Sequence, residues 1–248
     1  MIEIHRSKIP AVETHQMIEI DRTMMEDYRI ELIQMMENAG RNLAHLARER
    51  FLGGNPAGKH ILVLAGSGAN GGGALVAARR LSNWGARVTV GLGREPETMT
   101  PIPAHQLDIL QRMKIAGTKA SAKTNELEKN SFDLILDGLI GYGLKGDPLG
   151  LIAVLIRQAN ASGVPILALD APSGVNTSTG EVFKPAIKAS ATLTLALPKK
   201  GLIKEGISNY TGELYLADIS VPPVLYESLG LSMKAGPLFA ESEIIRVI

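Results

Sequence analysis

Cysteine, aromatic residues and an excess of charge of either sign are all scarce or absent in this chain of 248 residues. The absence of cysteine excludes disulfides, thiolate nucleophiles and cysteine metal sites, and it fits a reducing compartment. One tryptophan, five tyrosines and four phenylalanines offer no evident platform for stacking bases. With 26 basic and 25 acidic residues, the formal net charge is only +1. The composition therefore argues against a nucleic-acid partner.

Long apolar runs are absent as well. No run approaches the length that spans a bilayer, and the N-terminal residues lack the basic and apolar regions of a secretory leader. The five histidines show no metal-ligand spacing. We therefore expect no membrane partner and a soluble cytoplasmic protein. The length can bury one full α/β core, so we expect a single domain over residues 1–248.

What the sequence does contain is a regular alternation of helix-like and strand-like segments. Apolar residues at helical spacing over residues 14–50 predict two helices ahead of the first sheet strand. Strands are then predicted over residues 61–65, 87–91, 133–137, 165–170, 191–196 and 213–218, and helices over residues 70–83, 103–115 and 147–161. Several strands are apolar on both faces, which is typical of a parallel sheet covered by helices on both sides.

Three segments have less regular patterns. Residues 117–131 are polar and predict a short strand or a loop. Pro222 and Pro223 are expected to close the last strand, and the tail from Leu225 to pack as a short helix or cover. The methionines of residues 14–50 are interpreted as core filler, with a Met-rich partner groove as the alternative. Residues 36–40, Met-Glu-Asn-Ala-Gly, indicate either close helix packing or a wall of a site.

The predicted strand at residues 61–65 ends in a glycine-rich turn that opens a helix. Gly66, Gly68 and Gly71 have the G-x-G-x-x-G spacing, in which small residues let the backbone approach a pyrophosphate. The N-terminus of the following helix would present free N–H groups and a partial positive charge. The pattern predicts a phosphate site, with a plain strand-to-helix turn without ligand as the alternative.

Three further strands end in polar groups. Asp137 precedes a glycine-rich loop, Asp170 and Ser173 flank a turn with a proline, and Lys199 supplies positive charge after a third strand. Because ligands of open parallel sheets bind at the carboxyl ends of the strands, we expect these groups to converge with the glycine turn. Two carboxylates, an amide, a hydroxyl and an ammonium suit a phosphorylated ligand and acid–base chemistry.

The oxygen donors of this predicted site indicate which cation it would take. Asn70, Asp137 and Ser173 are hard oxygen donors, which favour an alkali or alkaline-earth cation over zinc. Asp137, Ser173 and Asp170 also have a structural interpretation as cap or turn residues. For any one of them the sequence leaves the choice open, and for all three together it favours function.

These motifs, in this order, resemble the YjeF N-terminal domain family, whose characterised enzymatic members are NAD(P)H-hydrate epimerases. The resemblance runs from about Thr14 to Pro222 and rests on residues 36–40, 70–72, 137–144, 169–174 and 198–202. It implies a three-layer α/β/α sandwich with a Rossmann-like, mostly parallel sheet. In this arrangement the N-terminal helices, residues 14–50, precede a core over about residues 60–222.

The resemblance also implies a ligand, a reaction and a partner. It implies that NAD(P)HX, the hydrated nicotinamide dinucleotide, is the substrate, that Asp170 contacts its reactive end, and that a potassium ion is held by Asn70, Asp137 and Ser173. The reaction would interconvert the R and S epimers at the hydroxyl-bearing ring carbon and feed a separate dehydratase. We expect Asp170 to protonate the departing hydroxyl and to accept a proton from the returning water. The substrate-binding residues would be Ala69, Asn70, Gly71, Gly72, Gly73, Gly141, Tyr142, Gly143, Leu144, Lys145, Gly146, Asp147, Asp170 and Lys199.

The chain departs from the family at one place in the glycine loop. The family commonly reads Asn-Asn-Gly-Gly-Asp-Gly, whereas residues 69–74 read Ala-Asn-Gly-Gly-Gly-Ala, so one amide and one carboxylate are missing. This loop favours the alternative of a non-catalytic nucleotide-binding or assembly module of the same fold. A nicotinamide-dependent oxidoreductase is a third hypothesis, favoured by the glycine spacing and by Glu95. We also expect a homodimer through the N-terminal helices.

Overall fold

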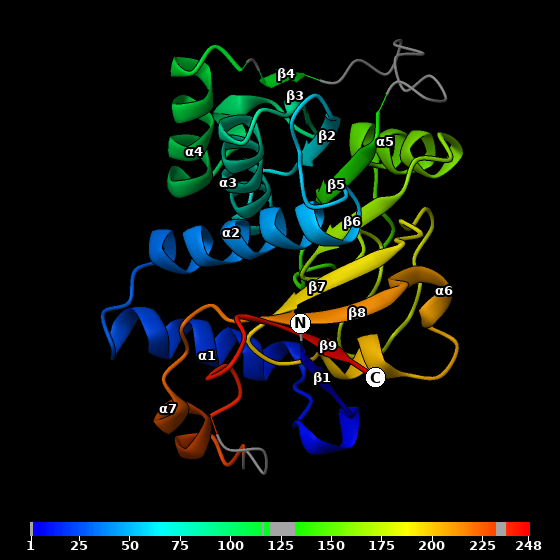
Figure 1. Cartoon of the computed structure of the whole chain (residues 1–248). Helices are drawn as coiled ribbons and strands as arrows, with labels where there is room; N and C mark the ends of the chain where they lie inside the picture. The colour runs from blue at the N-terminus through cyan, green and yellow to red at the C-terminus, as the bar shows by residue number, and fades with distance from the viewer. Residues whose placement is uncertain (1, 116, 120–131, 232–236) are drawn as a thin grey trace.

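A computed structural model describes residues 2–115, 117–119, 132–231 and 237–248. In these residues a sheet of nine strands runs in the order β1-β9-β8-β7-β6-β5-β2-β3-β4 (Figure 1). The strands are β1 (Ile2–Ile4), β2 (His60–Ala65), β3 (Arg87–Leu92), β4 (Gly117–Lys119), β5 (Leu134–Gly138), β6 (Ile166–Leu169), β7 (Ala191–Leu195), β8 (Glu213–Ala217) and β9 (Ile244–Val247). The α-helices are α1 (Thr14–Glu26), α2 (Leu32–Arg50), α3 (Ala69–Asn83), α4 (Pro101–Arg112), α5 (Gly150–Ala161), α6 (Ser208–Thr211) and α7 (Pro223–Ser228).

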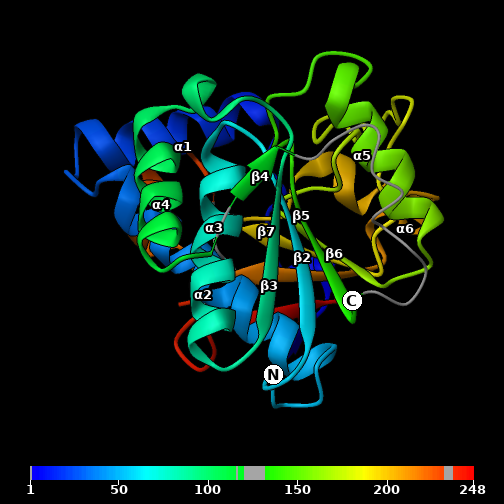
Figure 2. The same cartoon turned by 90° about the horizontal axis from the view of Figure 1, so that it is seen from above.

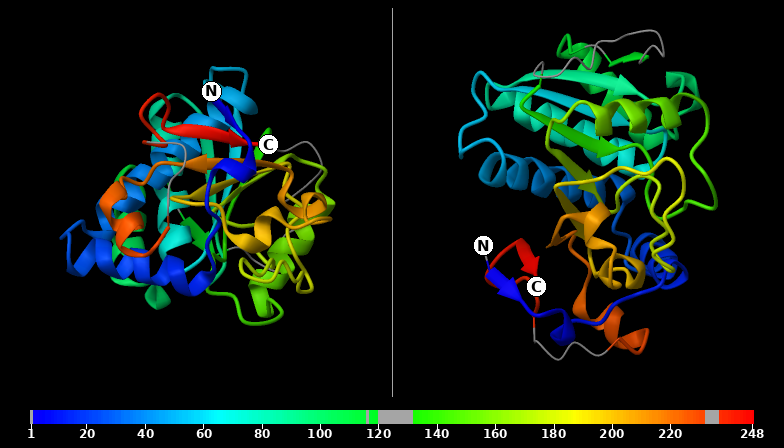
Figure 3. Two further views of the ribbon diagram at one scale, coloured as in Figure 1. Left: turned by 90° about the horizontal axis from the view of Figure 1, so that it is seen from below. Right: turned by 90° about the vertical axis from the view of Figure 1, so that its right-hand side faces the viewer.

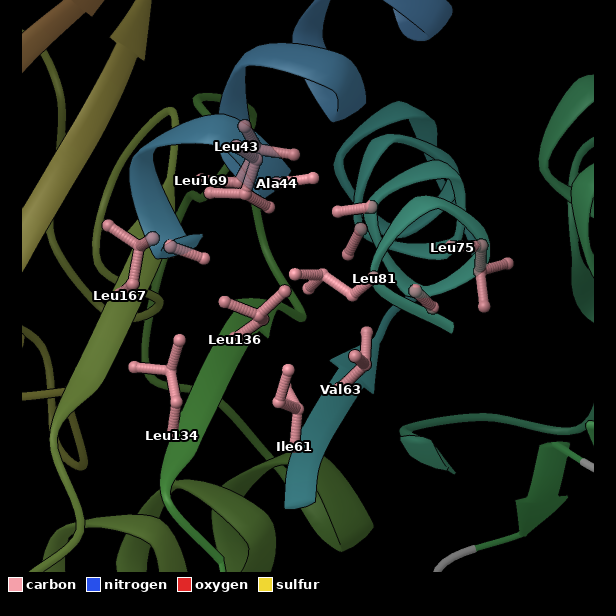
Figure 4. Packing of buried hydrophobic residues seen from close by; sticks show 14 of the residues in the cluster. Leu43, Ala44, Ile61, Val63, Leu75, Leu81, Leu134, Leu136, Leu167 and Leu169 are labelled. Atoms are coloured by element: carbon pink, nitrogen blue, oxygen red, sulfur yellow. The ribbon is translucent and has the colours of Figure 1, made fainter. Parts of the chain in front are cut away.

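Helices cover both faces of the sheet. Figure 2 shows α2, α3 and α4 on one side of the strands and α5 and α6 on the other. On the first side, leucines of α2 and α3 pack on alternate residues of the strands, such as Ile61 and Val63 of β2 (Figure 4). On the second side, Leu62 and Leu64 of the same strand pack with α5. Each fully buried leucine stabilises the fold by about 2 kcal/mol relative to exposure. Burial on both faces explains why these strands are apolar throughout, and the predicted α/β/α sandwich is confirmed.

The order of the strands determines where a ligand can bind. From β2 the chain builds outward through β3 to β4, and it then returns to the other side of β2 and continues from β5 to β8. The strands from β2 to β8 are parallel, so their carboxyl ends share one edge of the sheet. The reversal between β2 and β5 opens a crevice at that edge, where open α/β sheets bind their ligands.

The six strands and three later helices expected from the sequence correspond to β2, β3, β5, β6, β7 and β8 and to α3, α4 and α5, within three residues at each end. The two expected N-terminal helices are α1 and α2. Each begins at a glutamate that exchanges capping hydrogen bonds with a glutamine three residues later, Glu13 with Gln16 and Glu31 with Gln34. The short expected strand after residue 117 is β4, and residues 120–131 of that segment lie outside the described residues.

The edge of the sheet differs from the expectation. Pro222 and Pro223 do not end the sheet, because β9 pairs antiparallel with β8, and β1 pairs parallel with β9. The first and last described segments therefore lie side by side (Figure 3). With three and four residues, β1 and β9 are too short to show a period in the sequence. The tail does contain the expected short helix, α7, which begins at Pro223. No helix of the described residues is long and apolar enough to cross a bilayer.

Candidate functional site

A cavity of about 320 Å³ lies at the carboxyl ends of the parallel strands, at the reversal between β2 and β5. Its size is at the lower end of the roughly 300–1,000 Å³ found for small-molecule sites. The wall combines α1, α2, the first turn of α3 and the segments after β5, β6 and β7. The expected convergence occurs for Asp170, Lys199 and the glycine turn, whereas Asp137 and Ser173 are not among the described residues that line the cavity. The convergence brings Ala69, Asn70, Gly71, Gly141, Tyr142, Gly143, Asp170 and Lys199 to one cavity.

The turn from β2 into α3 is packed backbone against backbone. A Cβ atom on Gly66 would lie 2.0 Å from the carbonyl oxygen of Leu139, and one on Gly71 would lie 1.9 Å from that of Gly66. Gly66 N also donates to Gly138 O at 3.0 Å. These contacts join the loop after β2 to the loop after β5 and direct the first turn of α3 toward the cavity. The unpaired N–H groups of that turn are suited to an anion.

Some of the expected substrate residues lie elsewhere. Among the described residues, neither Gly72 and Gly73 nor residues 144–147 line the cavity. A Cβ atom on Gly72 would meet the sulfur of Met36, and one on Gly73 would meet Leu169 Cδ2 at 2.7 Å. The side chain that the family pattern places at residue 73 would therefore point at β6 from inside α3. Leu169 and Ala39, the two residues within 4 Å of that carbon, both line the cavity, so the group missing at residue 73 would lie directly beside the cavity wall.

Asp170 and Lys199 form a buried ion pair in the cavity wall. Their side chains are 2% and 0% exposed. The Lys199 ammonium donates to Asp170 Oδ1, to Thr194 Oγ1 at 3.1 Å and to Leu195 O at 2.9 Å, so each of its three protons has an acceptor. The other carboxylate oxygen, Asp170 Oδ2, receives no hydrogen bond from the described residues. The ammonium thus holds one oxygen of Asp170, and the second remains available to a ligand.

Around this ion pair, two neighbouring strands end in the same strained backbone conformation, a residue with positive φ. Asp170 has φ +64° and is spanned by a hydrogen bond from Ala171 N to Leu169 O at 2.8 Å. Ala196, after β7, has φ +63°, and Leu197 N donates across it to Leu195 O at 2.7 Å. Tight turns of this hand are rare, and each residue held this way costs on the order of 1–3 kcal/mol. The two turns place the carboxylate of Asp170 and the carbonyl of Leu195 around one ammonium.

Asp137 and Ser173, two of the expected cation ligands, are in direct contact. Asp137 Oδ1 accepts from Ser173 Oγ at 2.7 Å and Oδ2 from Ser173 N at 2.8 Å, and no described cation pairs with this fully buried carboxylate. Burial raises the pKa of Asp137 to about 6, against the hydrogen bonds from Ser173. The third expected ligand, Asn70, donates its amide protons to Leu169 O at 2.8 Å and to Ile140 O at 3.3 Å. Its amide oxygen is left without a donor among the described residues.

Asp21 is a residue of the cavity that the sequence interpretation missed. It lies in α1, where Oδ2 accepts a hydrogen bond from the Tyr142 hydroxyl at 2.6 Å. Burial raises the pKa of Asp21, and the Tyr142 hydrogen bond opposes that effect. Lys199 further lowers this pKa and Asp170 raises it, so the four groups are electrostatically coupled. The available signal was a carboxylate on the apolar face of a helix, four residues after Met17.

Residues 36–40 serve both of the roles that their sequence left open. Met36 and Ala39 line the cavity. A Cβ atom on Gly40 would lie 2.4 Å from Val76 Cβ and 2.5 Å from Gly73 O, so this glycine lets α2 pack closely on α3. Met17, Met24, Met35 and Met36 are buried and Met25 is partly buried, as expected of core filler, and three of these methionines also form part of the cavity wall.

Known proteins resemble this chain in sequence and in fold. Residues 32–201 match the family described as YjeF-related protein N-terminus. The NAD(P)H-hydrate epimerase of Dehalogenimonas lykanthroporepellens is 42% identical over 224 residues, 90% of this chain and 87% of that protein. The Bifunctional NAD(P)H-hydrate repair enzyme Nnr of Moorella thermoacetica is 38% identical over 86% of this chain, which spans 41% of that protein. The crystal structure of yeast ynu0, YNL200c, matches with a TM-score of 0.81 over 96% of this chain and 100% of that chain, at 24% identity, and shows the fold alone.

Proposed function

This chain belongs to the family described as YjeF-related protein N-terminus, and we propose that it is an epimerase of hydrated nicotinamide dinucleotides. It would interconvert the R and S forms of NAD(P)HX in the repair of nicotinamide nucleotides. The names of its relatives support an epimerase over an oxidoreductase or a non-catalytic module. The observation that carries the proposal is the free oxygen of a buried carboxylate, Asp170, in a cavity next to the first turn of α3.

Asp170 is the group that we place at the reacting carbon. Epimerisation at a hydroxyl-bearing ring carbon needs the hydroxyl to leave with a proton and water to return with loss of one. Asp170 Oδ2 is the oxygen of this residue available for proton transfer, because Oδ1 is held by the ammonium of Lys199. The carboxylate would also stabilise the cationic ring between the two steps. Apolar cavity residues such as Met17, Leu139 and Ile219 would exclude bulk water from that ring.

The first turn of α3 and the loop after β5 are proposed to bind the rest of the dinucleotide. Residues 69–71 of the helix start and Gly141 and Gly143 of the loop after β5 all line the cavity. A pyrophosphate bound there would be stabilised by the helix N-terminus. Residues 144–147 remain proposed contacts for portions of the substrate that extend beyond the cavity, whereas Gly72 and Gly73 are buried within α3.

We propose potassium as the cation of the cluster around Asp137. The chemistry of the donors fits, since the carboxylate of Asp137, the hydroxyl of Ser173 and the amide oxygen of Asn70 are all hard oxygen ligands. A fully buried carboxylate without a cationic partner among the described residues is also costly unless a cation compensates it. When bound, the ion would add positive charge beside the cavity and tie Ser173 to the loop after β5.

Two further partners are proposed. The product would pass to a dehydratase. The name of the Moorella relative, a bifunctional repair enzyme, is consistent with such a second activity. A homodimer would form through the N-terminal helices, where Ile18 of α1 and Tyr28 between α1 and α2 are 53% and 40% exposed. Sedimentation showing only monomers at micromolar concentration would refute the dimer.

The rate of R-to-S conversion of NADHX and NADPHX, followed by proton NMR, tests the proposed function. Asp170→Asn keeps the size of the side chain, so the variant is expected to bind the dinucleotide but to epimerise at least about a hundredfold more slowly. The assay is run in potassium and in choline chloride, and Asp137→Asn should abolish any acceleration by potassium. Unchanged turnover in Asp170→Asn would refute the role of Asp170. A folded wild-type protein that binds the dinucleotide without accelerating conversion would refute the epimerase.

A further inference from the structure

Asp21 and Tyr142 contribute a second acidic group to the cavity, from a different element than Asp170. Asp170 follows β6, at the carboxyl edge of the sheet, whereas Asp21 belongs to α1, which lies alongside the end of β7 (Figure 1). Val12, just before α1, pairs with Lys199, and the hydroxyl of Thr14 lies 2.9 Å from that of Thr177. The helix is therefore anchored across the strand ends, and both Asp21 and Asp170 line the cavity.

The environment of Asp21 is not that of a structural carboxylate. Among the described residues it forms no ion pair, and its single hydrogen bond comes from the Tyr142 hydroxyl to Oδ2. Asp21 Oδ1 therefore has no donor while its residue lines the cavity. A half-buried carboxylate without a cation weakens the fold, so packing does not explain this residue. An oxygen that is free to exchange a proton with a ligand does explain it.

We propose that Asp21, oriented by Tyr142, is a second proton-transfer residue, which serves the face of the reacting ring carbon opposite to the face served by Asp170. The inference rests on the proposed epimerase function. In one direction, protonated Asp21 gives its proton to the hydroxyl, which leaves as water with the electron pair of the C–O bond. Water then adds to the other face of the ring cation and gives a proton to ionised Asp170. One proton enters and one leaves, and the reverse reaction exchanges the two roles.

Both the stereochemistry and the electrostatics favour two groups. An epimer forms only when the new oxygen arrives on the face opposite to the one that the hydroxyl left, and a carboxylate fixed at a strand end reaches one face. The two carboxylates also have different surroundings, which is how pairs of acids divide the roles of proton donor and acceptor. Asp170 is paired with the ammonium of Lys199, whereas burial raises the pKa of Asp21 and favours its protonated form.

Oxygen exchange separates the two faces experimentally. Each pure epimer is incubated with protein in ¹⁸O-labelled water, and label uptake is measured beside R–S interconversion, with the uncatalysed rates subtracted. In Asp21→Asn, interconversion is expected to fall at least about a hundredfold with an unchanged dissociation constant for the dinucleotide. The epimer whose hydroxyl faces Asp170 should keep exchanging oxygen within about tenfold of wild type, because departure and return on that face remain catalysed. The other epimer should lose exchange.

Two results would overturn the inference while leaving the epimerase in place. One is interconversion by Asp21→Asn within a few-fold of the wild-type rate, and the other is an equal loss of exchange from both epimers. Tyr142→Phe is a second variant that keeps the ring, and it should lower the same rates in the same unequal way. Glu26→Gln, on the exposed side of α1, is the matched control and should behave as wild type. A wild-type protein that does not interconvert the epimers would instead refute the proposed function itself.

Discussion

Replacing Lys199 with Met tests whether the buried pair with Asp170 is one coupled unit. Met has a similar length but no charge, so Lys199→Met leaves a 2% exposed carboxylate without its ammonium. The remaining donors to Asp170 Oδ1 are Leu195 N at 3.3 Å and Thr194 Oγ1 at 3.5 Å, which do not replace a cation. Removing one partner of a buried ion pair costs about 3–5 kcal/mol of unfolding free energy. We expect a loss of that size.

The next residue in the chain provides the control. Lys200 forms an ion pair with Glu13 at 2.7 Å, but the two side chains are 49% and 40% exposed. Exposed pairs contribute between about 0 and 1 kcal/mol, so Lys200→Met should be close to neutral. Urea denaturation of both variants measures the difference, provided that the slope with urea concentration stays that of the wild type.

A double variant completes the experiment. Asp170→Asn combined with Lys199→Met removes both charges of this pair, so it should be more stable than Lys199→Met alone although it carries one more substitution. Equal losses for Lys199→Met and Lys200→Met would refute the argument that burial makes this pair different. A double variant less stable than Lys199→Met would show that the two residues do not act as a pair.

Two other substitutions test the glycine turn after β2 and the hydrogen-bonded carboxylate of Glu213 at the start of β8. Gly71→Ala should destabilise the protein by about 2 kcal/mol or more in urea denaturation, because the added carbon would lie 1.9 Å from Gly66 O. Gly68→Ala is the control: its added carbon meets nothing within 4 Å, so the substitution should cost less than about 1 kcal/mol. A similar loss in both glycine variants would contradict the assigned close approach. Hydrogen bonds from Arg50, and to a smaller extent from Tyr215, lower the pKa of Glu213 to about 2. The ionised carboxylate therefore stabilises the fold above about pH 4.5, and this stabilisation is lost as the pH falls toward 2. Glu213→Gln should therefore be less stable than wild type at pH 7 in urea denaturation, and a difference that fails to shrink at pH 3.5 would refute this origin.

The main elements of the fold could be predicted because their signals are local. The strands from β2 to β8 that belong to the core are buried on both faces, which makes their residues apolar, and the helices between them repeat apolar residues at helical spacing. The edge strands β1 and β9 escaped prediction for the opposite reason. They are short, and they become strands only because a segment from the other end of the chain lies beside them.

The candidate site was predictable to a similar depth. Asp137 and Asp170 end predicted strands and Asn70, Ser173 and Lys199 follow them, and parallel strands bring such ends to one edge. Their individual contacts were not predictable, because they depend on side-chain geometry between separate loops. The same limit applies to the missing family carboxylate at residue 73, whose place beside the cavity residues Leu169 and Ala39 only the packing of α3 shows.

The sequence by itself determined the α/β architecture, the glycine turn after β2 and the set of oxygen and nitrogen groups at the strand ends, because each depends on residues close together in the chain. The tertiary structure alone decided which of these groups meet. It paired Asp170 with Lys199 across 29 residues and Asp21 with Tyr142 across 121 residues. Such pairs leave no period or spacing in the sequence, because they form only when helices and strands pack and bury both partners in one cavity wall.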